Sequence, residues 1–355
     1  VDKPYARPPL SKGLWKGEKT PQEIKYTLPE GATAHTACRV ATVHIAEKSV
    51  STEAGNEHGY EKLLLATGGT PKRLPAATDD QILYYRTLQD YHRLRELTAQ
   101  YRSFVVIGGG FIGSEIAAAL RLNEKDVTLL FPEESICARL FPRALSGYLN
   151  RYYESKGVHV HPATKINRVE GTLGNYTLHT EQRTTIKAEV IVAGLGIEPN
   201  TTLAAEAGLQ VDDGILANEY LQTSAPDIYA AGDAVRFKDA LLDQWRRVEH
   251  EDNAVTMGKA AGRNMAGANE PYTHSPMFYS DLFDLGYEAV GELRADMATY
   301  VDWQEEFHKG VVYYLKDDYV RGVLLWNVWE QVTHARELIA ANKPVQPQDL
   351  QGRIT

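Results

Sequence analysis

Three glycines at the spacing GxGxxG are the residues of this sequence best suited to binding a dinucleotide. Gly108, Gly110 and Gly113 follow the apolar run 104–107 and precede the alanine-rich segment 114–122. The first glycine permits a tight turn, the second lets backbone approach a pyrophosphate, and the third lets a helix pack closely on a strand. The N–H groups that begin this helix can bind the phosphates. The spacing predicts an NAD site; the alternative is a glycine turn in an unrelated α/β domain.

An acidic residue stands where such a site needs one. Glu133 lies just past the apolar run 126–131, which is predicted to be the next strand. A carboxylate there accepts hydrogen bonds from ribose hydroxyls and repels a 2′-phosphate. The sequence therefore predicts NADH in preference to NADPH.

A second strand also runs into a glycine turn, at Gly232-Asp233 after the run 228–231. An aspartate in this position can accept a hydrogen bond from a ribityl hydroxyl of a flavin. Alone, a Gly-Asp pair in a turn is more often structural. The functional interpretation gains weight only from the neighbouring segment that begins at Thr223.

The elements around the glycine motif predict a βαβ unit with a right-handed crossover. A helix at 144–156, a strand at 158–161, an antiparallel excursion over 167–190 and a strand at 190–196 continue this domain. Before it, the prolines of segment 4–12 exclude an initial helix, although Ser11 could cap a short helix after it. The polar tail 343–355 is expected to be loose.

Composition excludes several classes of protein. The net charge is −9 and no basic run is present, so no nucleic-acid partner is expected. No run of 18 apolar residues predicts a membrane span. Cys38 and Cys137 lie far apart in the sequence, which fits a reducing compartment. It also excludes the flavoprotein disulfide reductases, because these enzymes need two close cysteines beside the flavin. No metal site is indicated.

Several motifs, in order, resemble those of the FAD-dependent pyridine-nucleotide oxidoreductases. They are Ala66-Thr67-Gly68, the glycine motif at 108–113, the segment 196–200, and the segment from Thr223 to Gly232-Asp233. The segment 4–12 narrows the resemblance to the branch of ferredoxin reductases and apoptosis-inducing factor. Segments 246–250, 277–281, 286–288 and 325–327 are most similar to apoptosis-inducing factor.

The resemblance implies a catalytic pair, Lys12 near flavin N5 and Glu115 on the NAD-site helix. The lysine would stabilise the anionic reduced flavin. Without the resemblance, Lys12 could be a solvated lysine and Glu115 an acid favoured by the helix dipole. Phe111 would cover the flavin face or else be a core aromatic. His250 would lie on the nicotinamide side.

The resemblance also implies a set of cofactor contacts. On the FAD side they are Arg7, Pro9, Lys12, Val40, Ala66, Thr67, Gly68, Arg86, Gly232, Asp233, Glu249, His250 and Tyr279, the last at a position where the family usually has tryptophan. On the NAD side they are Gly108, Gly110, Phe111, Ile112, Gly113, Glu115, Glu133 and Gly196.

The sequence also departs from the family pattern. The family's first GxGxxG, which grips the FAD pyrophosphate, is expected before Pro4 and is absent, so the FAD domain is expected to lack its first strand. The long C-terminal insertion of the animal apoptotic protein is missing, and Trp245 replaces an arginine of its dimerisation patch. Both differences argue against a death-signalling role.

The implied fold has two doubly wound α/β nucleotide-binding domains and a C-terminal α+β domain. FAD would be bound by 1–99 with 221–274, NAD by 100–220, and the last domain would span 275–355. The expected activity is hydride transfer from NADH to FAD, with electrons passing to a quinone, a ferredoxin or another protein. The alternatives are an NADH-dependent ferredoxin reductase and an NADH-sensing flavoprotein that acts through partner binding. A bacterial cytoplasmic location, with mitochondria as the alternative, and a homodimer are further expectations.

Overall fold

The computed structural model describes residues 2–78 and 80–355, and these form two compact units. The first unit contains the residues up to Tyr5 together with Lys25–Thr70 and Ile197–Phe278. The second contains Ala6–Ile24, Pro71–Gly196 and Tyr279–Thr355. These boundaries differ from those of the three predicted domains, and the three-domain division stays a prediction.

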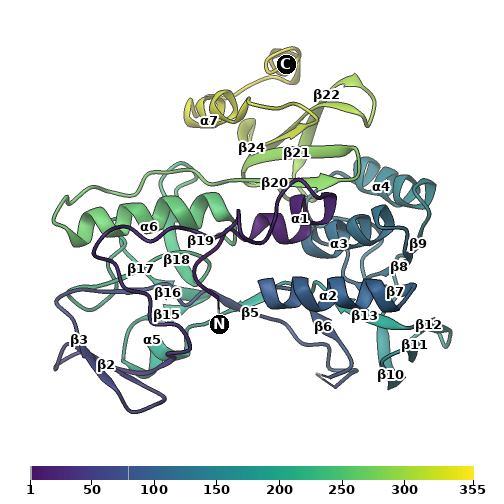
Figure 1. Cartoon of the computed structure of the whole chain (residues 1–355). Coiled ribbons are helices and arrows are strands. Elements are labelled where there is room, and N and C mark those ends of the chain that lie inside the picture. Colours follow the sequence, from purple (N-terminus) through teal and green to yellow (C-terminus); the bar gives the residue numbers. More distant parts are fainter. Residues whose placement is uncertain (1, 79) are drawn as a thin grey trace. The chain divides into compact units, whose positions relative to one another are not determined.

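A five-stranded parallel sheet forms the centre of the second unit, in the order β6-β13-β7-β8-β9. Its strands are β6 (Leu83–Tyr84), β7 (Ser103–Ile107), β8 (Asp126–Leu130), β9 (Val158–His161) and β13 (Val190–Ala193). Helices α2 (Leu88–Gln100), α3 (Phe111–Leu122) and α4 (Arg143–Ser155) pack against its strands, as Figure 1 shows. The predicted βαβ unit is β7, α3 and β8.

Local sequence explains these elements. Residues 104–107 are almost completely buried, which is typical of a parallel strand covered on both faces. Helix α2 begins with a capping box, in which Thr87 accepts a hydrogen bond from the N–H of Asp90 and the Asp90 carboxylate accepts one from the N–H of Thr87. The antiparallel excursion is also present, as β10 (Ile166–Thr172), β11 (Asn175–Thr180) and β12 (Thr185–Ala188).

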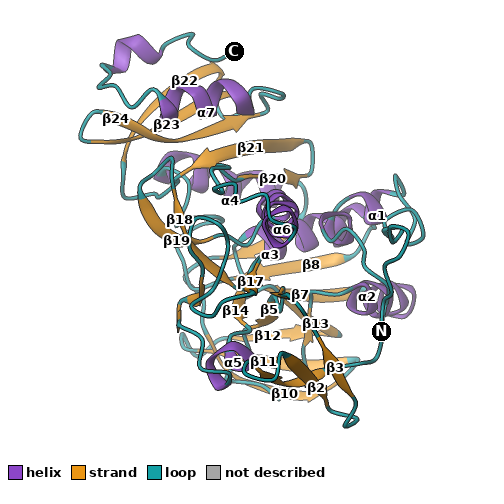
Figure 2. Cartoon of the chain, turned by 90° about the vertical axis from the view of Figure 1, so that its left-hand side faces the viewer, coloured by secondary structure: helices purple, strands orange, loops and turns teal. Residues whose placement is uncertain are grey.

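A second, antiparallel sheet lies in the C-terminal part of this unit, in the order β20-β21-β24-β23-β22. Its strands are β20 (Met277–Leu282), β21 (Leu285–Gly291), β22 (Ala298–Glu305), β23 (Lys309–Lys316) and β24 (Tyr319–Trp326). Helix α7 (Val332–Ala340) packs on β21 and β24, and Figure 2 shows this helix against the strands.

The C-terminal tail is not loose, so that expectation was wrong. A 3-10 turn, η2 (Pro347–Leu350), contacts β22, and the side chains of Leu350 and Ile354 are buried. The N–H of Gly352 also donates to the Asp302 carboxylate. The expectation rested on the polar composition of the segment as a whole, whereas two apolar residues, Leu350 and Ile354, are enough to anchor it.

The N-terminal segment of the second unit turns before Lys12 as its prolines require. It forms the 3-10 turn η1 (Pro8–Ser11) and the short helix α1 (Gly13–Lys16). The indole of Trp15 donates to the carbonyl of Leu10, which fixes the turn. The Ser11 side chain does not cap α1, contrary to expectation, because its hydroxyl donates elsewhere, as described below.

The first unit is built from smaller sheets. Strands β4 (Leu63–Leu65) and β17 (Ile228–Ala230) pair in parallel, beside helix α6 (Glu251–Met265). Antiparallel pairing joins β1 (Val40–His44), β2 (Ser49–Thr52) and β3 (Glu57–Gly59). A mixed sheet contains β15 (Val211–Asp212), β16 (Gly214–Leu216), β18 (Val235–Asp239) and β19 (Gln244–Arg247). Helix α5 (Thr202–Glu206) and the pair β5 (Gly69–Pro71) and β14 (Ile197–Pro199) complete the elements.

The mixed α/β fold and a C-terminal part built from strands and a helix were therefore predicted correctly, and the structure shows that this C-terminal sheet is antiparallel. Among the described residues of the first unit, however, parallel pairing is limited to two strand pairs, β4 with β17 and β16 with β18. No helix in residues 2–78 and 80–355 combines the length and apolarity needed to cross a membrane.

Candidate functional site

The glycine motif forms the turn between β7 and α3 that the spacing predicts. A Cβ on Gly113 would lie 1.8 Å from the carbonyl oxygen of Gly108, and a Cβ on Gly108, whose φ is +121°, would lie 2.4 Å from that of Gly194. These two glycines are therefore required by packing. A Cβ on Gly110 would meet no atom within 4 Å. This open space beside the N-terminus of α3 suits the approach of a pyrophosphate.

Glu133 lies just after β8, on the same sheet as the glycine turn. Its carboxylate pairs with the guanidinium of Arg139 at 2.6 Å. Arg139 is 83% exposed, whereas Glu133 is 26% exposed. The sequence predicted the role of Glu133 but not its pairing with Arg139. That pairing depends on how the chain turns back between the two residues, which no motif indicates.

The implied catalytic pair is present as an ion pair. Lys12 Nζ lies 2.7 Å from Glu115 Oε1, with side-chain exposures of 11% and 2%. The ammonium also lies over the ring of Tyr279, 5.1 Å from its centroid. The solvated-lysine alternative is thus not what the structure shows. Tyr279 itself is 40% exposed.

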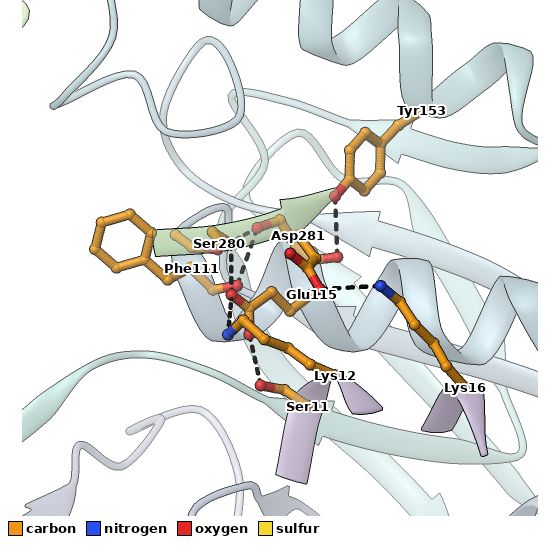
Figure 3. Close-up of polar contacts among 10 residues, drawn as sticks. Ser11, Lys12, Lys16, Phe111, Glu115, Tyr153, Ser280 and Asp281 are labelled. Carbon is orange, nitrogen blue, oxygen red and sulfur yellow. Dashed lines mark hydrogen bonds and ion pairs between the residues drawn. The ribbon is translucent and has the colours of Figure 1, made fainter. Parts of the chain in front are cut away.

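Two serines complete the surroundings of Glu115, and sequence reasoning did not assign either to it. Ser11 Oγ donates to Oε2 and Ser280 Oγ donates to Oε1, each at 2.5 Å. Figure 3 shows the three donors converging on the carboxylate of α3, from η1 (Ser11), from the junction of η1 and α1 (Lys12) and from β20 (Ser280). Beside them, Lys16 pairs with Asp281 at 2.9 Å, nearer the surface.

Aromatic side chains surround this cluster. Phe111, at the start of α3, is half-buried and lies 6.4 Å, centroid to centroid, from Tyr287. Tyr287 stacks on Trp326 at 5.7 Å. Burial, followed by the acidic groups Cys137 and Glu115, holds the pKa of Tyr287 well above its ordinary value. Tyr287 is therefore neutral across the physiological range.

In the first unit, the Ala66-Thr67-Gly68 turn follows β4 and is fixed by Asn200. Asn200 Nδ2 donates to the carbonyl of Thr67 at 2.9 Å, and Thr67 Oγ1 donates to the carbonyl of Asn200 at 2.7 Å. Gly68 has a φ of +65°. The motif at 196–200 therefore holds the motif at 66–68 in place.

The Gly232-Asp233 turn follows β17, so both turns leave the same end of a parallel pair. Gly232 has a φ of +83° and Asp233 is half-buried. Arg247 Nη1 donates to the carbonyl of Asp233 at 3.2 Å and to Glu249 at 2.5 Å. Burial lowers the pKa of Arg247, but Glu249 and Asp213 outweigh it and give a net rise. Arg247, which the sequence did not single out, joins two predicted FAD residues.

His250 is the residue before α6 and stacks on Phe278, with the ring centroids 4.4 Å apart and the planes at 13°. Close by, Asp252 pairs with His274 at 2.6 Å and accepts a hydrogen bond from the N–H of Met277. These contacts fix the chain just before Tyr279. His250 is thus an ordered aromatic of the first unit.

The remaining predicted residues divide between the units. In the second unit, Arg7 is exposed, Pro9 is buried in η1, Arg86 precedes α2, Ile112 is 39% exposed, and Gly196 has a φ of +80°. In the first unit, Val40 begins β1 and is half-buried. Each cofactor role stays a prediction.

Cys137 is unsuited to thiol–disulfide chemistry. Cys38 belongs to the first unit and Cys137 to the second, and both are free. Burial, and secondarily Glu115, raises the pKa of Cys137 to about 12. A thiol in that state is a poor nucleophile. Within the described part of the chain, no group of three or more His, Cys, Asp and Glu residues could hold a metal ion.

The residues fit the two cofactors that the motifs imply. The space at Gly110 and the carboxylate of Glu133 suit a pyrophosphate and a ribose of NAD(H). The turns after β4 and β17 suit the polar chain of FAD, and Lys12 suits an electron-rich ring.

Two family models match the chain. Residues 2–258 match the family model described as pyridine nucleotide-disulphide oxidoreductase. Residues 261–303 and 294–341 match the C-terminal domain of mitochondrion-associated apoptosis-inducing factor.

Individual relatives fall into the same group. The chain is 33% identical to apoptosis-inducing factor 1 of Dictyostelium discoideum, over 97% of this chain and 72% of that protein. It is 31% identical to a Drosophila melanogaster protein described as an apoptosis-inducing factor 1, over 96% of this chain but only 59% of the fly protein. The structure of the covalent complex of putidaredoxin reductase with putidaredoxin superposes with a TM-score of 0.89 at 30% identity, covering 99% of this chain and 87% of that one.

Proposed function

Since this chain belongs to the pyridine nucleotide-disulphide oxidoreductase family, we propose that it transfers hydride from NADH to FAD and passes the electrons to a ferredoxin-type protein. Membership confirms the predictions of an oxidoreductase and of FAD and NAD(H) as cofactors. The acceptor is inferred from putidaredoxin reductase, which forms a complex with putidaredoxin. Quinones remain alternative acceptors.

The protein's part in this reaction is binding and electrostatics. FAD, when bound, accepts the hydride at N5. The glycine turn and the N-terminus of α3 bind the NADH pyrophosphate, and Glu133 orients the ribose. Asp233 and the turn at 66–68 hold the polar chain of FAD. Lys12, fixed by Glu115, supplies a positive charge that stabilises the charge gained on reduction.

The observation that carries this proposal is the buried Lys12–Glu115 pair. Burying two charges costs free energy, and a well-packed apolar pair would serve the fold as well. Since the fold does not require a buried ion pair here, the position of this pair beside the partly exposed ring of Tyr279 supports a functional role.

The test is an anaerobic titration of the flavin-containing protein with NADH, followed by addition of ferredoxin or a quinone. Loss of the flavin absorbance and fast reduction of ferredoxin are expected. Lys12→Ala should slow reduction by NADH, whereas Lys16→Ala is the matched control, because Lys16 lies on α1, directly after Lys12, but pairs with Asp281. Flavin that stays oxidised with NADH would refute the activity. Rapid quinone reduction without ferredoxin reduction would refute the acceptor alone.

A second candidate is an NADH-sensing flavoprotein of the apoptosis-inducing-factor type. The C-terminal family match favours it, as does the segment 325–327, whose Trp326 is fully buried against Tyr287. It predicts slow turnover with every acceptor, a persistent long-wavelength charge-transfer band, and a homodimer that forms with NADH. Size-exclusion chromatography with and without NADH tests the last point. A bacterial cytoplasmic location is part of the proposal for either function.

A further inference from the structure

Glu115 is surrounded by more donors than one ion pair provides. Its carboxylate is 2% exposed and accepts from the Lys12 ammonium and from the hydroxyls of Ser11 and Ser280. Both oxygens are therefore occupied: Oε2 by Ser11, and Oε1 by Lys12 and Ser280. Ser11 and Lys12 are neighbours in the chain, whereas Ser280 comes from a segment far from both.

The two hydroxyls act in one direction. An ionised carboxylate has no hydrogen to donate, so each serine must donate to it, and such charge-assisted bonds stabilise the ionised form. Without them, a carboxylate this deeply buried would be stabilised by Lys12 alone, in competition with the cost of desolvation. Neutral Glu115 would then release the ammonium from its fixed position.

We propose that Ser11 and Ser280 are positioning residues that keep Glu115 ionised and thereby hold the Lys12 ammonium in place toward the flavin. The claim that the Lys12 ammonium is held toward the flavin rests on the proposed function. The claim that the serines keep Glu115 ionised does not. Ser11 adjoins Lys12 in the chain and Ser280 adjoins Tyr279, whose ring lies beneath the ammonium. The same two serines thus also fix the segments that carry the cation and its aromatic neighbour.

Infrared spectroscopy of the protein tests the first half without reference to activity. The stretch of a protonated Glu115 carboxyl is identified by its loss in Glu115→Gln, and its appearance is followed as the pH falls. In Ser280→Ala and in Ser11→Ala the midpoint of this appearance should rise by about one pH unit, a tenfold change in proton affinity. Ser11→Thr, which retains the hydroxyl, should restore the wild-type midpoint.

Asp281→Asn is the matched control. Asp281 lies next to Ser280 on β20, and its replacement breaks the ion pair with Lys16, which joins β20 to the N-terminal segment as the Ser280 cluster does. The replacement removes no donor to Glu115. Its infrared midpoint should equal that of the wild type. A shift as large as that of Ser280→Ala would show that the serine acts only by joining segments, and would overturn the proposal.

The flavin midpoint potential tests the second half. Ser280→Ala should move the potential in the same direction as Glu115→Gln, and Ser11→Thr should not. An infrared midpoint unchanged in both alanine variants overturns the proposal. So does a potential that Glu115→Gln moves and Ser280→Ala does not. If Glu115→Gln leaves the potential in place, the assignment of the pair to the flavin fails, while the infrared result still decides whether the serines keep Glu115 ionised.

Discussion

Replacing Lys12 by alanine removes the one positive charge bonded to Glu115 and leaves a buried carboxylate behind. At 2.7 Å and an effective dielectric near 20, the attraction lost is about 6 kcal/mol before desolvation is counted. Breaking one side of a buried pair typically costs about 3–5 kcal/mol. Because Ser11 and Ser280 still donate to Glu115, we expect the lower end, about 3 kcal/mol.

The assay is urea unfolding of the wild type and of four variants at neutral pH. Lys16→Ala should cost less than about 1 kcal/mol, because its pair with Asp281 is about one-third exposed. Lys12→Ala combined with Glu115→Gln should cost less than the sum of the two single changes, since the double variant contains no uncompensated charge.

The flavin potential is tested with Lys12→Ala and with Glu115→Ala. Lys12→Ala should move the midpoint to more negative potential by some tens of millivolts, since about 30 mV corresponds to 1.4 kcal/mol for two electrons. Glu115→Ala should have a smaller effect, because losing its negative charge and losing its hold on Lys12 oppose each other. Lys12→Ala that destabilises no more than Lys16→Ala, together with an unmoved potential, would refute the reasoning.

Four further predictions concern other parts of the protein. Glu133→Ala removes the carboxylate predicted to bind the ribose, so the free energy of NADH binding should weaken by about 1–3 kcal/mol. It also leaves the Arg139 guanidinium without its carboxylate partner, so discrimination against NADPH should relax in reductive titrations; an unchanged preference would contradict this. Asp233→Ala should purify with a lower flavin-to-protein absorbance ratio, and full occupancy would count against its role. Gly113→Ala should lower the unfolding temperature because its Cβ meets backbone, whereas Gly110→Ala should keep that temperature and weaken NADH binding; equal thermal losses would remove the distinction. Burial raises the pKa of Cys137 to about 12, so below that pH the thiol stays protonated, and a thiol reagent at pH 8 should leave it unmodified until the protein unfolds.

The sequence predicted best what is encoded locally. An apolar run, a glycine spacing and an alanine-rich run are enough to specify β7, the turn and α3, because neighbours along the chain are neighbours in space. Lys12 and Glu115 are different. They are more than a hundred residues apart, and only the resemblance paired them.

The missed residues show where local reasoning ends. Serine is a common helix-capping residue, yet the hydroxyl of Ser11 donates to the buried carboxylate of Glu115 and does not cap α1. Ser280 carried no spacing signal, although it adjoins Tyr279. In the tail, Leu350 and Ile354 stand four residues apart after a proline, which is a weak signal for an anchored turn.

The cluster at Glu115 also has a consequence for how the protein folds. Its bonds from Ser11 and Ser280 join residues separated by 104 and 165 positions. Contacts of such separation form after local ones, because closing long loops must come first. Interactions absent from the transition state act chiefly on the unfolding rate. We therefore expect this cluster to lengthen the lifetime of the folded chain, and Ser280→Ala to accelerate unfolding while leaving the refolding rate nearly unchanged.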